Sequence, residues 1–97
     1  MAGSLLSVDF EVYGQVQGVL FRKHLQEMAM NNNCVGWVQN TKRGTVIGQL
    51  QGPPESVKTL KDWLKKTGSP KSRIVRCVFK NEIEIKKLEH SEFLVIK

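Results

Sequence analysis

The chain has 97 residues, of which 40% are hydrophobic and 25% are charged, and its formal net charge is +6. This length suits one domain, expected to span residues 1–97, with a modest core. No stretch approaches the roughly 20 apolar residues of a membrane-spanning helix, and residues 1–6 are too short and uncharged for a signal peptide. We therefore expect a cytoplasmic protein with no membrane association, whose positive charge favours an anionic partner.

The first half of the chain predicts a strand followed by a helix. Val8, Phe10 and Val12 alternate with polar residues over positions 7–13, which indicates a half-buried strand. A helix is predicted over residues 21–31, where four apolar residues recur at helical spacing: Phe21, Leu25, Met28 and Ala29. The asparagines at 31–33 are expected to end this helix, because asparagine tolerates the left-handed conformation found at helix ends.

The second half predicts a hairpin, another helix and two more strands. Strands over 35–40 and 45–51 are joined by a polar turn with glycine at its end, which predicts an antiparallel hairpin. A second helix is expected to start within residues 52–55, since proline and the following acid suit a first turn, and to end before the turn at 67–70. Further strands are expected at 76–84 and 92–97.

This order of elements predicts an α+β protein with a ferredoxin-like βαββαβ sandwich, in which two helices cover one face of an antiparallel sheet. The first helix crosses between the first two strands, so these strands run parallel with the third strand between them. The end of the first strand and the end of the second, at Asn40, therefore meet at one edge of the sheet.

Residues 12–22 form a candidate anion site at this edge. Gly14 and Gly18 allow a tight loop with inward N–H groups, and the following helix begins with unpaired N–H groups and a positive dipole end. Arg22 adds a planar two-pronged cation that matches a phosphate. The alternative is a tight turn before a helix, with Arg22 paired to a nearby carboxylate.

Asn40 is the second candidate in this place. A neutral amide cannot act as a base, but it can hold a water molecule through its donor and its acceptor. The alternative is a turn asparagine that binds its own backbone. The shared location of Arg22 and Asn40 favours a site.

These two segments resemble the acylphosphatase family, in its small eukaryotic type. Residues 12–22 match its pattern of aliphatic-x-Gly-x-Val-Gln-Gly-Val-x-Phe-Arg without a break, and residues 36–46, with Gly52 after them, match its second pattern. With the turn at 68–70 and the later strands, the resemblance covers essentially the whole chain. The chain departs from the family at Asn32 and Asn33, and at Leu20, where phenylalanine is frequent.

The resemblance implies hydrolysis of the carboxyl–phosphate bond of acyl phosphates, which yields a carboxylate and inorganic phosphate. It implies that Asn40 positions the attacking water. It also implies that the phosphate is held by the Arg22 guanidinium and by the backbone of Gln15, Val16, Gln17, Gly18, Val19, Leu20, Phe21 and Arg22. A carboxylate leaves readily, so positioning and electrostatic stabilisation can suffice, and we expect no cofactor and no metal. The expected partners are a small acyl phosphate and inorganic phosphate, as product and competitive inhibitor, and the expected state is a monomer.

The remaining candidate groups point to no other chemistry. Cys34 and Cys77 are expected to be buried free thiols, because a secreted domain of this size usually carries more bridges. These cysteines and the two histidines, His24 and His90, are too dispersed to match a zinc ligand pattern, and the histidines are expected to be surface or packing residues.

Two other classes of protein share parts of this pattern. An RNA-recognition domain has the same element order, but it needs exposed aromatic residues on its central strands. The first strand is instead expected to expose Asp9 and Glu11, whose charges would repel phosphates, so no nucleic-acid partner is expected. A regulatory module that binds an anion without turnover stays open, and phosphate release from an acyl phosphate would distinguish it from an enzyme.

Overall fold

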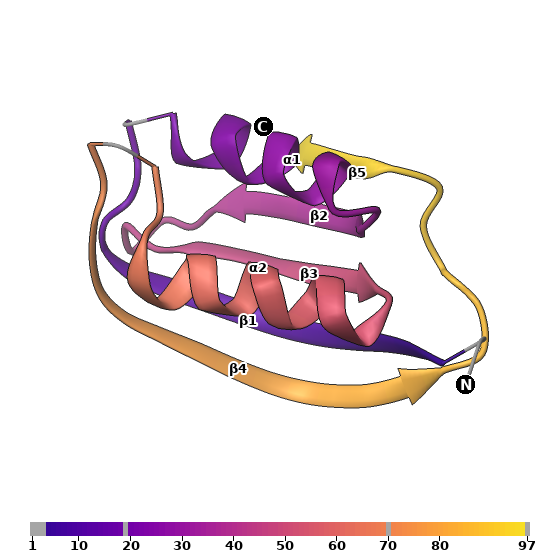
Figure 1. Ribbon diagram of the computed structural model, residues 1–97. Helices are drawn as coiled ribbons and strands as arrows, with labels where there is room; N and C mark the ends of the chain where they lie inside the picture. Colours follow the sequence, from indigo (N-terminus) through magenta and orange to yellow (C-terminus); the bar gives the residue numbers. More distant parts are fainter. Residues whose placement is uncertain (1–3, 19, 70, 97) are drawn as a thin grey trace.

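The protein is described by a computed structural model that covers residues 4–18, 20–69 and 71–96. Within these residues the elements follow one another in the order β1 (Leu5–Gln15), α1 (Phe21–Asn31), β2 (Val35–Asn40), β3 (Val46–Gly52), α2 (Pro54–Lys66), β4 (Arg73–Ile85) and β5 (Phe93–Ile96). The five strands form one sheet in the order β4-β1-β3-β2-β5, and both helices lie on the same face of it (Figure 1). The predicted ferredoxin-like α+β fold is confirmed.

The sheet is mixed, so the expectation of a purely antiparallel sheet is wrong at one edge. β1 and β2 each pair antiparallel with β3, as predicted, and β4 pairs antiparallel with β1. β5 pairs parallel with β2. The reason is where β4 ends: Ile85 pairs with Leu5 at the beginning of β1, so the chain must enter β5 from the end at which β2 also begins (Figure 1).

β1 and β4 are both longer than predicted. β1 extends to residues 5–15 and β4 to 73–85, whereas the alternation of side chains predicted 7–13 and 76–84. Register shifts interrupt the β1–β4 ladder between Ser7 and Asp9 and between Tyr13 and Gly14. Such bulges insert an extra residue, which breaks the period of two on which the prediction depended.

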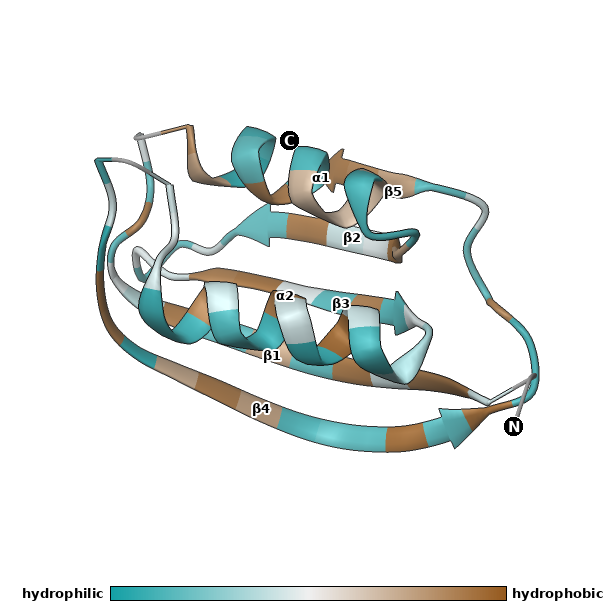
Figure 2. Cartoon of the chain, viewed as in Figure 1, coloured by the Kyte–Doolittle hydropathy of each residue, from teal (hydrophilic) through white to brown (hydrophobic). Residues whose placement is uncertain are grey.

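The core lies between the sheet and the helices. Val8, Phe10 and Val12 of β1 are at most 2% exposed. Of the predicted stripe of α1, Phe21, Leu25 and Ala29 are buried and Met28 is partly buried, and α2 buries Val57, Leu60 and Leu64. Figure 2 shows hydrophobic residues concentrated in the strands, while hydrophilic residues recur along both helices. The first helix ends as predicted, since Asn33 adopts a left-handed conformation with φ of 59°.

The opposite face of the sheet is less exposed than expected. Four polar residues on the strands or at their ends, Ser7, Glu11, Thr45 and Gln51, are buried. Gln51 donates to a carboxylate oxygen of Glu89, in the segment between β4 and β5, and Arg43 binds Glu11 from the β2–β3 turn. The predicted exposure of Glu11 is therefore wrong, because segments outside the strands cover this face.

The C-terminal ends of β1, β2 and β5 lie at the same end of the sheet, which is the edge at which the sequence placed the candidate site. This follows because β1 and β2 both run opposite to β3, and β5 runs parallel to β2. α1 begins at the same edge, six residues after β1 ends. No helix in the described residues combines the length and apolar character needed to cross a membrane.

Candidate active site

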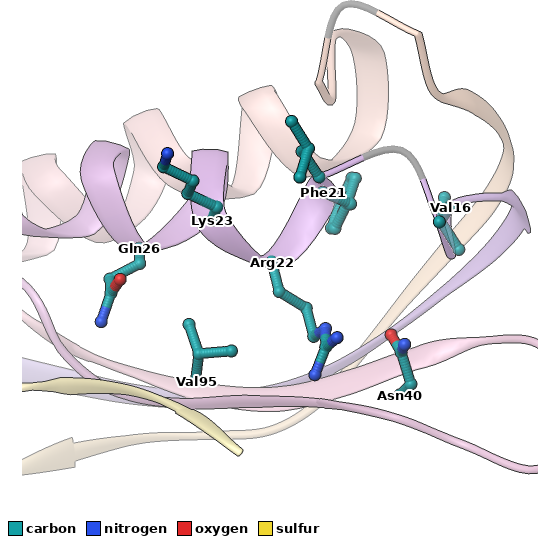
Figure 3. A pocket seen from close by; sticks show the side chains of 9 residues that line it. Val16, Phe21, Arg22, Lys23, Gln26, Asn40 and Val95 are labelled. Atoms are coloured by element: carbon teal, nitrogen blue, oxygen red, sulfur yellow. The ribbon is translucent and has the colours of Figure 1, made fainter. Parts of the chain in front are cut away.

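A cavity of about 370 Å³ lies at this edge, between the first half of α1 and the ends of β2 and β5. Its described lining residues are Val16, Gly18, Leu20, Phe21, Arg22, Lys23, Gln26, Asn40 and Val95 (Figure 3). Arg22 and Asn40 therefore share one cavity, although they are 18 positions apart in the sequence. The topology brings them together, since one begins α1 and the other ends β2.

Arg22 extends from the first turn of α1 towards the sheet, and its side chain and that of Asn40 both line the cavity (Figure 3). Its Nη1 donates a hydrogen bond of 2.9 Å to the carbonyl oxygen of Ile96 in β5. No carboxylate of the described residues lies within 4.0 Å of it, so the alternative of a structural ion pair is not observed. One bond orients the guanidinium, and its other N–H groups can bind an anion.

Asn40 ends β2 with a buried amide oxygen. Its Oδ1 has no hydrogen-bond partner among the described residues, so the alternative of a side chain that accepts from its own backbone is not observed. A buried acceptor without a partner costs about 1–3 kcal/mol. Such unsatisfied groups in folded proteins call for an explanation, and a bound water molecule is one such explanation.

The loop between β1 and α1 leaves the start of the helix uncapped. Gly18 and Leu20 have φ values of 74° and 58°, which places both in the left-handed region. Leu20 precedes α1 without a side-chain capping bond, and no acidic residue occupies the first turn. The first N–H groups of α1 are therefore available as hydrogen-bond donors, and the positive end of the helix dipole lies at the cavity.

The other residues of the predicted phosphate segment separate into two groups. Val16, Gly18, Leu20 and Phe21 line the cavity with Arg22. Gln15 is exposed and pairs with Arg73 in the sheet, and the Gln17 side chain turns to the β2–β3 turn, where it binds two carbonyl groups. Neither glutamine lines the cavity. Val19 lies outside the described residues.

Three lining residues escaped the sequence analysis. Lys23 and Gln26 come from α1, and Val95 comes from β5. Gln26 lies one helical turn after Arg22, so helical spacing alone could have identified it; its Nε2 donates to the carbonyl oxygen of Phe93 at 2.8 Å. Val95 carried no local signal, because its place depends on which strand β5 pairs with.

The cysteines and histidines lie outside the cavity lining. Both thiols are free; Cys34 is buried as predicted, whereas Cys77 is half-buried. Burial raises the pKa of Cys34 to about 11 and that of Cys77 to about 12, so both stay protonated at neutral pH. His24 Nδ1 donates to the carbonyl oxygen of Leu20, and His90 Nε2 donates to Gln49 Oε1. Across the described ranges, no three His, Cys, Asp or Glu side chains gather as a metal site requires.

Comparison with known protein sequences finds acylphosphatases. The family model described as acylphosphatase matches residues 8–94. Acylphosphatase-1 of Xenopus tropicalis is 58% identical, with 95% of this chain and 94% of the relative aligned, and acylphosphatase-1 of Homo sapiens is 53% identical, with 97% and 95% aligned.

Solved structures share the fold. The acylphosphatase from Bacillus subtilis matches with a TM-score of 0.84 at 31% identity, covering 95% of this chain and 99% of that one. Full-length HypF matches with a TM-score of 0.78 at 23% identity; the match covers 96% of this chain and only 12% of HypF, and it shows a likeness of fold alone.

Proposed function

From the premise that this chain belongs to the acylphosphatase family, and is an acylphosphatase enzyme, we propose how its cavity hydrolyses an acyl phosphate. The phosphate binds to the Arg22 guanidinium and to the N–H groups at the start of α1, and Asn40 positions the attacking water. The observation that carries this proposal is that Asn40 lines the same cavity as Arg22, and that its buried Oδ1 lacks a hydrogen-bond partner among the described residues.

Binding of the phosphate is supported by the charges around the cavity. Arg22 has no carboxylate within ion-pair distance in the described part of the chain, and its bond to Ile96 fixes the orientation of the guanidinium. The uncapped start of α1 adds N–H donors and the positive end of the helix dipole. Inorganic phosphate, as the product, would occupy the same donors and inhibit competitively.

The chemical step transfers a phosphoryl group to water. Asn40 Oδ1 accepts a hydrogen bond from a water molecule, whose oxygen attacks the phosphorus. A new P–O bond forms, and the bond to the carboxyl oxygen breaks, with its electron pair leaving on the carboxylate. The proton of the water passes to a phosphate oxygen of the substrate.

This route needs no acid or base from the protein. The described lining contains no Asp, Glu or His side chain, and a carboxylate leaves without being protonated. Arg22 and the helix N–H groups stabilise the charge on the transferring group, which is the role that positioned donors play in phosphoryl transfer.

The test is Asn40→Ala, assayed with a simple acyl phosphate. We expect the turnover number to fall by about 10²-fold or more, the scale for loss of one preorganised polar contact. Inhibition by inorganic phosphate should change far less, because Arg22 and α1 remain. Asn31→Ala, at the exposed end of α1, is the matched control and should keep normal turnover.

Two outcomes would change the assignment. Unchanged turnover in a folded Asn40→Ala protein would remove Asn40 from the mechanism. Weak phosphate inhibition with a normal melting temperature would reassign Asn40 to substrate binding. The regulatory alternative predicts phosphate binding without phosphate release in the wild-type chain.

We also propose that the enzyme acts as a cytoplasmic monomer. The cavity is built from α1, β2 and β5 of one chain, so no second copy is needed to complete it. Sedimentation at assay concentration tests this, and activity that depends on self-association would contradict it.

A further inference from the structure

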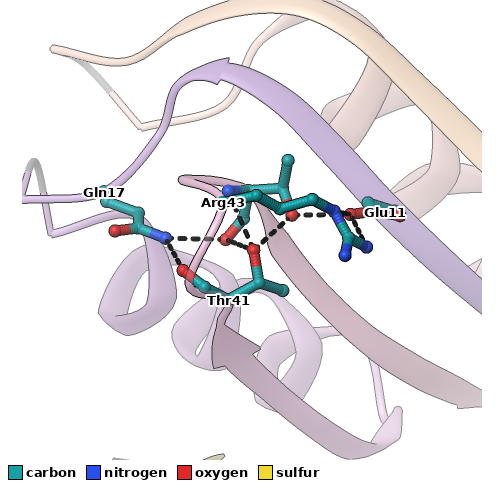
Figure 4. A network of polar contacts seen from close by, with 5 residues as sticks. Glu11, Gln17, Thr41 and Arg43 are labelled. Atoms are coloured by element: carbon teal, nitrogen blue, oxygen red, sulfur yellow. Dashed lines mark hydrogen bonds and ion pairs between the residues drawn. The ribbon is translucent and has the colours of Figure 1, made fainter.

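A hydrogen-bonded network joins β1 to the β2–β3 turn (Figure 4). It adjoins the cavity in sequence, because Thr41 follows Asn40 directly, and none of its side chains belongs to the cavity's described lining. Its centre is one carboxylate oxygen, Glu11 Oε2, which accepts from Arg43 Nε at 3.1 Å, Arg43 Nη2 at 2.7 Å and Thr45 Oγ1 at 2.6 Å. Glu11 is only 8% exposed. A charged carboxylate at such a depth is stable only when it is paired and hydrogen-bonded.

The network continues from Glu11 through the β2–β3 turn. Thr45 Oγ1 and Thr41 Oγ1 are 2.7 Å apart, and the Thr45 backbone N–H donates to Thr41 Oγ1. An ionised carboxylate only accepts hydrogen bonds, so the Thr45 hydroxyl donates to Glu11 and the Thr41 hydroxyl donates to Thr45. The hydrogen bonds from Thr45 and Arg43 hold the pKa of Glu11 below its ordinary value. Glu11 is therefore ionised at neutral pH, and the two hydroxyl groups keep these donor directions.

The phosphate loop holds the same turn from the other side. Gln17 Nε2 donates to the carbonyl oxygens of Thr41 at 2.9 Å and Thr45 at 2.8 Å. Thr41 follows Asn40 directly, and Asn40 pairs with Val46 directly after Thr45. The turn therefore connects the loop that begins the phosphate site with the residue that ends β2.

We propose that the Glu11–Arg43 pair is a positioning device for the reaction: through Thr45 and Thr41 it fixes Asn40 relative to the phosphate loop. Neither residue lines the cavity, so both are positioning residues rather than catalytic ones. The inference rests on the proposed role of Asn40. A displacement of about 1 Å between reacting groups can lower a rate by about 10²-fold, so a smaller shift of the turn is enough to matter.

The proposal predicts a particular kinetic signature. Phosphate is held by Arg22 and α1, which lie outside the network, whereas the water is held by Asn40, next to it. Disturbing Glu11 should therefore lower the turnover number while inhibition by inorganic phosphate stays nearly constant. A purely structural role would lower the melting temperature and leave the turnover of the folded protein unchanged.

The experiment is Glu11→Gln, which keeps the size of the side chain and removes its charge. We expect turnover to fall about tenfold, with the phosphate inhibition constant within about twofold of wild type. Glu82→Gln is the matched control, because it breaks the other ion pair of the described chain, with Lys61 on α2, away from the cavity. Its turnover should be unchanged.

A second variant covers the case in which Glu11→Gln fails to fold. The Arg43 side chain is 66% exposed, so Arg43→Gln removes both guanidinium donors with little loss of packing. It should lower turnover in the same direction by a smaller factor. Wild-type turnover in both folded variants, or in Arg43→Gln alone if Glu11→Gln does not fold, would overturn the proposal.

A double variant separates this inference from the proposed function. If Glu11 acts through Asn40, Glu11→Gln should lower turnover no further in an Asn40→Ala background. An equal additional loss in that background would overturn the positioning role and leave the role of Asn40 intact. Unchanged turnover in Asn40→Ala alone would instead overturn the proposed function.

Discussion

The two helices of this fold begin in opposite ways. α2 begins with Pro54, which has no N–H group to satisfy, and carries Glu55 in its first turn, close to the positive end of the dipole. α1 begins after Leu20 in a left-handed conformation, without a capping side chain and without an acid in its first turn. Its first turn carries Arg22 and Lys23 instead, and cations there oppose the dipole.

By these local rules, the start of α1 is less stable than the start of α2. α2 also lacks a side-chain capping bond, at Pro53, but its first turn has one N–H group fewer to satisfy and carries an acid of its own that complements the dipole. α1 combines a start without a side-chain capping bond, two cations in its first turn and a leucine at φ of 58°, and α2 shares only the first of these features. A bound phosphate would relieve the first two, so the helix that is poorer by local rules is the one suited to bind the substrate.

The largest effect should come from Arg22→Lys, which keeps the charge at α1 and removes the planar fork. We expect kcat/KM to fall by about 10²-fold or more, because a lysine cannot hold the phosphate through two aligned donors. Steady-state kinetics with an acyl phosphate measures it. Lys23→Arg is the control and should stay near wild type; near-normal kinetics for Arg22→Lys would show that charge alone suffices.

A smaller effect is expected from Lys23→Glu, which gives α1 the kind of first-turn acid that α2 has. The acid competes with phosphate for the dipole and repels it, so the phosphate inhibition constant should rise about tenfold. Lys58→Glu, in the first half of α2, makes the same change in net charge. Equal weakening by both variants would assign the effect to the whole protein rather than to the start of α1.

The converse change at α2 should have the smallest effect. Glu55→Gln removes the acid from its first turn, and the free energy of unfolding should fall by about 0.5 kcal/mol. Urea titration measures this loss, and turnover should be unchanged. Glu27→Gln, in the middle of α1, provides the comparison, and an equal loss there would show that position in the first turn is irrelevant.

The sequence predicted the location of the candidate site but not all of its lining. The loop glycines, the crossover helix and the order of the first three strands placed Arg22 and Asn40 at one edge of the sheet, because these features follow from local pattern and chain handedness. The contribution of Val95 could not be predicted, since it depends on β5 pairing parallel with β2.

Side-chain direction in the loop was also beyond the sequence. Gln17 lies between glycines and valines, and nothing in that pattern says whether its amide faces the cavity or the β2–β3 turn. The burial of Glu11 was hidden for a related reason. Alternation along β1 assigns Glu11 to the face away from the helices, but only the folded turn brings Arg43 over it.

The bond between Arg22 and Ile96 also bears on how the protein folds. It joins residues 74 positions apart, and the bonds of Gln17 and Glu11 to Thr45 span 28 and 34 positions. Contacts of such long range form only after large loops have closed, so folding is expected on the slow side for a chain of this length, in about milliseconds to seconds. During refolding, Arg22 gains its orienting partner only when β5 docks beside β2, and full activity is expected to return with that last strand.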